Sequence, residues 1–164
     1  MYLMSTSYNT YLSLSNVDIL PPSVLTSLQT SRNYCLSLIS DCIYYSLIFG
    51  GTDRSASELF DSVADSEMLH FRLLGGIICS AGGDPSVNTR LYRGEGRLSS
   101  KGDAHFVRRA IDDVSSRLQR TESELQRIAS RCSVGERRDM ILMIADNRAR
   151  NIRILSNYLD DCIG

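Results

Sequence analysis

The chain has 164 residues, enough for one domain with a substantial core, and its 43% hydrophobic and 23% charged residues are ordinary for a folded globular protein. A net charge of -1 and a pI near 6.1 give no electrostatic reason to expect nucleic acid or an anionic membrane as partner. The apolar runs fall far short of the roughly 20 residues that span a bilayer, so we expect no membrane partner either.

Targeting and cysteine content favour a cytoplasmic protein. The N-terminus lacks the basic start and apolar run of a signal peptide. The five cysteines are odd in number, scattered, and show no CxxC spacing of a zinc site. We therefore expect reduced thiols and a cytoplasmic location.

The first predicted elements are an arm and a helix. Residues 1–22 are rich in Ser, Tyr and Thr without a sustained period, which predicts an irregular N-terminal arm. A helix is predicted over Ser23–Phe49, ended by Gly50 and Gly51. The domain proper is expected over residues 23–164.

A second helix is predicted to follow after a short turn, which makes the two an antiparallel hairpin. Ser55 and Glu58 have the spacing of a capping box, and Gly82-Gly83 before Pro85 is a typical stop signal. An inward stripe recurs at steps of three and four, which is the rhythm of a bundle helix. Its members are Phe60, Val63, Glu67, His70, Leu74 and Ile77.

Glu67 and His70 occupy two stripe positions that normally hold apolar side chains. Because they are three apart on a helix, they are expected to point together into the bundle. A buried carboxylate without compensation costs several kcal/mol, on the order of the stability of a small domain. Either a metal ion or an internal hydrogen-bonded or ionic pair is therefore expected beside Glu67.

The second half of the chain predicts another helical hairpin. Residues 84–102 are polar, basic and without period, and extended chain of that length reaches about 60 Å, enough to cross the bundle. A third helix is predicted over Asp103–Arg131, with Val114 on its apolar stripe and Arg117 on its solvated side. A fourth is predicted over Val134–Asp161, after a capping box of Ser133 and Glu136. The pattern predicts an all-α fold, an antiparallel four-helix bundle with a long crossover between helices 2 and 3.

Two stretches resemble a known family. The segment SEMLHFRLLGGIICSAGGDP, which contains Glu67 and His70, is similar to the second helix of bacterial ferritin-like proteins of the rubrerythrin, bacterioferritin and manganese-catalase-like group. DCIYYSLIF resembles their first helix. The resemblance implies a ferritin-like bundle that holds two metal ions with a Glu from helices 1 and 3 and Glu-x-x-His from helices 2 and 4.

The implied ligand set is incomplete in this sequence. Glu67 and His70 match the family's motif, and the four remaining ligand positions carry other residue types. These degenerate positions are Cys35, Val114, Asn147 and Arg150. Since a di-iron or di-manganese centre needs several carboxylates, we expect no di-metal oxidase activity.

Two hypotheses describe what neutralises Glu67. In the first, an arginine of the fourth helix, Arg150 or in another register Arg148, points inward and pairs with Glu67, and His70 with two asparagines completes a polar network. In the second, a single metal ion (Fe, Mn or Zn) is held by Glu67, His70 and Cys35. The cofactor is thus none or one metal ion.

Three functions remain open at this stage. The chain is expected to be a divergent ferritin-like protein without di-metal chemistry; a metal-binding oxidoreductase or iron-handling protein is the first alternative. A structural or assembly protein, as spore-coat-like members of the family are, is the second. For a structural or assembly protein, the N-terminal arm and the basic crossover are candidate contact surfaces. The partner could also be a further copy of the chain in a homo-oligomer.

Overall fold

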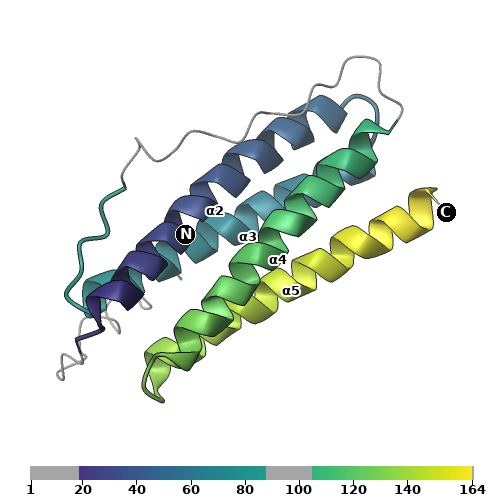
Figure 1. The fold of residues 1–164 in the computed structure, drawn as a ribbon. Coiled ribbons are helices and arrows are strands. Elements are labelled where there is room, and N and C mark those ends of the chain that lie inside the picture. Colours follow the sequence, from purple (N-terminus) through teal and green to yellow (C-terminus); the bar gives the residue numbers. More distant parts are fainter. Residues whose placement is uncertain (1–18, 88–104, 164) are drawn as a thin grey trace, which may run out of the picture.

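Four helices make up the described part of the chain (Figure 1). The computed structural model describes residues 19–87 and 105–163, and no strand occurs in these ranges. The helices are α2 (Pro22–Phe49), α3 (Arg54–Ser80), α4 (Phe106–Ser130) and α5 (Glu136–Ile163). The expected all-helical fold class is confirmed. The expected arm up to residue 18, residues 88–102 of the expected crossover, and the first two residues of the expected third helix, 103 and 104, lie outside the described residues.

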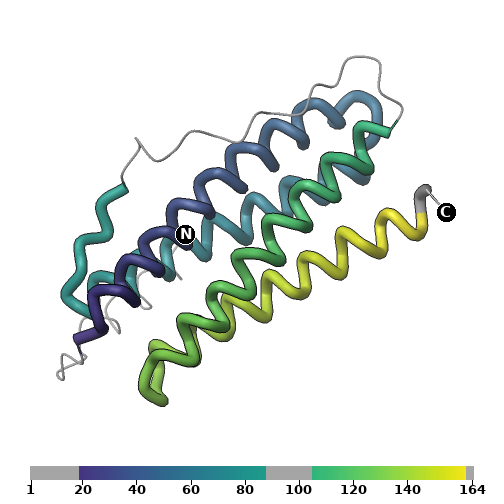
Figure 2. Tube along the Cα trace, viewed as in Figure 1, coloured from purple at the N-terminus to yellow at the C-terminus, as the bar shows by residue number. Residues whose placement is uncertain are grey.

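The helices form two hairpins that pack side by side (Figures 1 and 2). α2 packs mainly against α3 and α4 mainly against α5, while α2 with α4 and α3 with α5 join the two hairpins. α3 and α4 run in the same direction, as expected for a connection that crosses the length of the bundle. The first residue of α4, Phe106, lies with its ring centroid 5.4 Å from that of Phe49 at the end of α2. α4 therefore begins at the end of the bundle where α2 finishes and α3 begins.

The start of α3 differs from the predicted capping box. Asp53 is the N-cap, and its carboxylate accepts a hydrogen bond from the backbone N–H of Ala56 at 2.9 Å. Ser55 is therefore already inside the helix, and Glu58 instead pairs with Arg54 at 2.8 Å. The prediction was wrong by two residues because aspartate and serine are both good caps, and the sequence offers both.

The helix stripes largely follow the predicted rhythm. All six stripe residues of α3 are buried, including the two polar ones. In α5 the buried face contains Ile141, Ile144, Arg148 and Leu155, and Ile154 is exposed. Of the two registers open in the sequence, the structure thus adopts the one that turns Arg148 inward. α5 begins at Glu136, directly after Gly135, whose φ of +153° favours glycine.

The core consists of two apolar clusters with polar residues between them. One cluster contains Leu28, Leu74, Ile128 and Ile144, near the end of the bundle where α3 finishes; the other contains Phe49, Phe60, Ile111 and Leu155, near the opposite end. Along each of three helices, buried polar side chains lie between the members of the two clusters. These are Glu67 and His70 of α3, Thr121 of α4, and Arg148 and Asn151 of α5. The middle of the bundle is therefore its polar layer.

No helix within residues 19–87 and 105–163 has both the length and the apolar character needed to cross a lipid bilayer.

Candidate functional site

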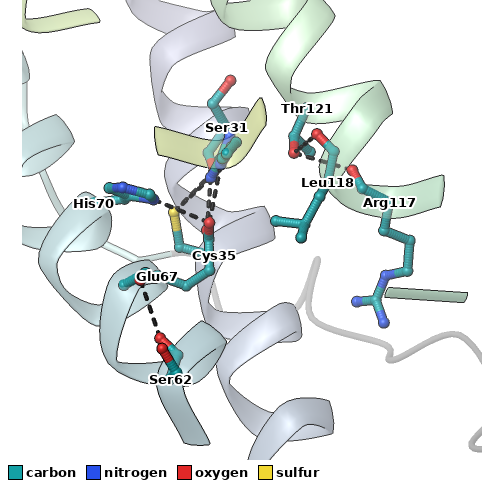
Figure 3. Close-up of polar contacts among 10 residues, drawn as sticks. Ser31, Cys35, Ser62, Glu67, His70, Arg117, Leu118 and Thr121 are labelled. Carbon is teal, nitrogen blue, oxygen red and sulfur yellow. Dashed lines mark hydrogen bonds and ion pairs between the residues drawn. The ribbon is translucent and has the colours of Figure 1, made fainter. Parts of the chain in front are cut away.

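The candidate site is the polar centre in the middle of the bundle (Figure 3). Glu67 and His70 project from α3 toward Cys35 of α2, and all three side chains are buried. Glu67 is 0% exposed, so its carboxylate depends entirely on protein partners. The inward aim expected for this acid–imidazole pair is confirmed.

Arg148 of α5 binds both carboxylate oxygens of Glu67. Its Nε donates to Oε1 at 3.0 Å and its Nη2 donates to Oε2 at 2.7 Å, with both side chains fully buried. Two parallel hydrogen bonds of this kind match the planar fork of a guanidinium to a carboxylate. The pair therefore joins the two hairpins through the core.

His70 supports the same carboxylate from its own helix. Nδ1 lies 2.9 Å from Glu67 Oε1, across one helical turn. Since Glu67 is an acceptor when ionised, Nδ1 carries the proton in this contact. Oε1 thus accepts two hydrogen bonds, one from His70 and one from Arg148, and Oε2 accepts one.

Cys35 completes the centre from the side of α2. Arg148 Nη2 donates to the Sγ of Cys35 at 3.2 Å. The thiol in turn donates to the carbonyl oxygen of Ser31 at 3.5 Å. Burial raises the pKa of the Cys35 thiol well above its ordinary value, and the negative charge of Glu67 raises it further. Cys35 is therefore a neutral thiol that accepts from Arg148, and not a thiolate.

The charges of the centre are mutually dependent. Burial alone raises the pKa of a carboxyl group, but the charge of Arg148 and the hydrogen bonds from His70 and Arg148 outweigh it and lower the pKa of Glu67 to about 2. Burial likewise disfavours the charged form of Arg148, yet Glu67 raises the pKa of that guanidinium above its ordinary value. The centre is an ion pair at neutral pH, and its charges cancel.

The other residues singled out from the sequence take different positions. Val114 is buried among apolar side chains, as its stripe position indicated. Arg150 is exposed, so the partner of Glu67 is Arg148 and not Arg150. Asn147 and Asn151 were expected to complete the network, but Asn147 Oδ1 and Asn151 Nδ2 are buried without a hydrogen-bond partner among the described residues.

A second buried ion pair was missed by the sequence analysis. Arg117, expected on the solvated side of its helix, is only 5% exposed and donates to Asp41 of α2 at 2.7 Å. Its guanidinium also contacts Asp113 at 3.4 Å and Ser37 Oγ, and Tyr45 donates to Asp113 at 3.5 Å. The amino-acid composition of α2 could have indicated this pair, because the helix has only two charged residues, Arg32 and Asp41, in 28 positions. A charge on so apolar a helix needs a partner on the next helix.

The residues at the centre do not fit a di-metal group. Its single carboxylate already gives both oxygens to Arg148, and the guanidinium places a positive charge where a metal cation would need negative ligands. Among the residues described here, no group of three or more His, Cys, Asp or Glu side chains is arranged to hold a metal ion. Binding of one metal ion by Glu67, His70 and Cys35 stays a prediction.

The site and fold define a four-helix bundle with an Arg–Glu–His centre. No family model matches the chain, and comparisons with curated proteins and with solved structures found no match either.

Proposed function

We propose that this protein is a divergent ferritin-like bundle in which the guanidinium of Arg148 takes the place of the metal ions. The observation that carries the proposal is the fork of Arg148 on both oxygens of a fully buried Glu67. In this role the protein is a structural or assembly protein without metal-dependent oxidation chemistry.

Charge balance supports the proposal. A buried ion pair of one carboxylate and one guanidinium is neutral, whereas a divalent ion added beside them leaves a net positive charge in a core of low polarity. Arginine also stays protonated in proteins, so it supplies a cation without any loading step. The bundle therefore folds around an internal cation that cannot dissociate.

The test is the metal content of the full-length protein, purified after growth with added iron, manganese and zinc. Elemental analysis is expected to give far less than one metal ion per chain in folded protein. The variant Glu67→Gln serves as the matched control, because it removes the one carboxylate of the centre. One or two ions per chain in the wild-type protein, lost in Glu67→Gln, would contradict the proposal.

A one-metal protein is the second candidate, and the position of Cys35 favours it. Cys35 Sγ and Glu67 Oε2 both contact the same nitrogen of Arg148, at 3.2 and 2.7 Å, and His70 Nδ1 contacts the other oxygen of Glu67. Cys35 Sγ and Glu67 Oε2 therefore both face the point that Arg148 Nη2 occupies, so a metal ion binds the three side chains only if Arg148 withdraws and His70 turns toward that point. In this second candidate the protein is a metal-dependent oxidoreductase or an iron-handling protein.

Substitution of cysteines separates the two candidates. Cys35→Ala removes the thiol that distinguishes the one-metal candidate. Cys42 is also a buried cysteine of α2, and Cys42→Ala removes a thiol from the neighbouring apolar cluster as a control. The one-metal candidate predicts that zinc binding, measured by calorimetry, is lost in Cys35→Ala and kept in Cys42→Ala. Equal behaviour of the two variants would remove the basis for that candidate.

A further inference from the structure

Apart from Arg32, the outward side of α2 carries no charged side chain. The helix contains two charged residues, and both are engaged with the protein. Arg32 donates to the carbonyl oxygens of Phe71 and Pro85 and lies 3.9 Å from the Phe71 ring centroid, and Asp41 is buried against Arg117. Helices on a protein surface normally carry charges on the solvent side, and depletion of charge is typical of the core of a protein interface.

Apolar side chains occupy the part of this side that adjoins α3. Ile43 is 42% exposed and Leu47 is 76% exposed on α2, and Met68 is 41% exposed on α3. Both helices contribute to one face. Arg32 and Gly75 mark the line where α2 and α3 meet, since a Cβ on Gly75 would lie 3.0 Å from Arg32 Nε.

Helical periodicity extends that line along both helices. Ile43 follows Arg32 by eleven residues, and Met68 precedes Gly75 by seven, which are three and two full turns. Leu36, half-buried, lies one turn beyond Arg32 on the same side. α2 and α3 pack side by side (Figure 2), so these side chains follow one line along the two helices, hereafter the α2/α3 face.

The charges that flank the α2/α3 face are arranged with opposite signs on either side of Met68. Asp61 and Asp65 precede it on the exposed side of α3, and Arg72 follows it. A twofold axis that passes near Met68 reverses the direction of α3, so that Asp65 of one copy faces Arg72 of the other, and the reverse. The face is therefore complementary in charge to a second copy of itself, with Met68 at the centre and with Ile43 and Leu47 toward the end of the face where α2 turns into α3.

We propose that a second copy of this chain docks on the α2/α3 face, through a twofold axis close to Met68 and with an Asp65–Arg72 ion pair on each side. Ile43 and Leu47 are buried in this dimer. The proposal goes beyond the proposed function and is independent of it, because the metal content of the core and the association state of the protein are measured separately.

The test is the mass of the full-length protein in solution, measured by sedimentation equilibrium across a range of concentrations. A dimer is expected, and Leu47→Asp is expected to weaken it by about a hundredfold or more, because the symmetry introduces the unfavourable carboxylate twice. Met143→Asp is the matched control, since Met143 is exposed to a similar degree as these residues but belongs to α5. It should leave the dimer unchanged.

Charge reversal identifies the partner as a second copy in this orientation. Asp65→Arg alone and Arg72→Asp alone are each expected to weaken the dimer by about tenfold or more, and the double variant is expected to restore it. A monomeric wild-type protein would overturn the proposal. That result is the one expected if residues 88–104 or an unrelated protein, and not a second copy, cover the face. A dimer whose stability is unchanged by Leu47→Asp and by the charge reversals would also overturn the proposal.

Discussion

Arg148 and Glu67 lie 81 positions apart in the sequence, yet their side chains form two hydrogen bonds in the middle of the bundle, at 3.0 and 2.7 Å. The pair belongs to α5 and α3, which are in different hairpins. It therefore fixes how the hairpins dock, because a slide of one hairpin along the other would leave two buried charges without partners.

Removal of Arg148 alone is expected to be costly. In Arg148→Met a buried carboxylate loses the guanidinium that neutralises it, and the free energy of unfolding is expected to fall by about 3–5 kcal/mol. The double variant Glu67→Gln/Arg148→Met removes both charges and should recover a large part of this loss. Urea denaturation followed by circular dichroism measures both values. Similar losses in the single and double variants would show that packing, not the unpaired charge, dominates.

The centre also predicts how stability depends on pH. The pKa of Glu67 is lowered to about 2 in the folded protein, from an ordinary value of 4.5 that applies to the unfolded chain. The ion pair therefore stabilises the fold above pH 4.5, and this contribution, about 3 kcal/mol, is lost as the pH falls toward 2. In Glu67→Gln the free energy of unfolding should decline less between these two pH values. Parallel pH profiles for the two proteins would contradict the assignment.

Much of the fold could be predicted because the apolar rhythm of each helix is regular. Val63 and Leu74 on α3 and Leu118 on α4 were all placed correctly on the buried face. The polar partners could not be placed as well. A helix position fixes the direction of Cα–Cβ, but a long side chain reaches several ångströms from it, so Arg117 on the predicted solvated side still reaches Asp41.

The candidate site shows the same limit. Glu67 and His70 were identified because they interrupt an apolar stripe, whereas the choice between Arg148 and Arg150 depended on the register of α5. Two registers of that helix place apolar and polar side chains about equally well. The ion pair itself favours one of these registers, because a buried Glu67 needs a cation within reach. A contact between residues so far apart in the sequence cannot be predicted from the pattern of α5 alone.

The two glycines in the middle of α3 are expected to differ in what they tolerate. A Cβ on Gly75 would lie 3.0 Å from Arg32 Nε, whereas nothing lies within 4 Å of one on Gly76. Gly76→Ala should therefore stabilise the protein by about 0.5–1 kcal/mol through helix propensity. Gly75→Ala should give no gain or a loss, because the guanidinium of Arg32 is held by Phe71 and Pro85 and has little freedom to move. Equal gains from the two substitutions in thermal unfolding would contradict this account.

The thiols are expected to react at very different rates. Cys79 is exposed, whereas Cys35 and Cys42 are buried and burial raises the pKa of both thiols. Since the thiolate is the reactive form, a thiol reagent at pH 8 should modify Cys79 within minutes and leave Cys35 and Cys42 unmodified in the folded protein. Mass spectrometry of peptides after limited labelling measures each site.

The Arg148→Met variant gives the sharper test, because it removes the donor to Cys35 Sγ and loosens the centre around it. In that variant labelling of Cys35 should increase, while Cys42, in the other apolar cluster, should change less; equal increases at both sites would indicate that the whole bundle opens rather than its centre.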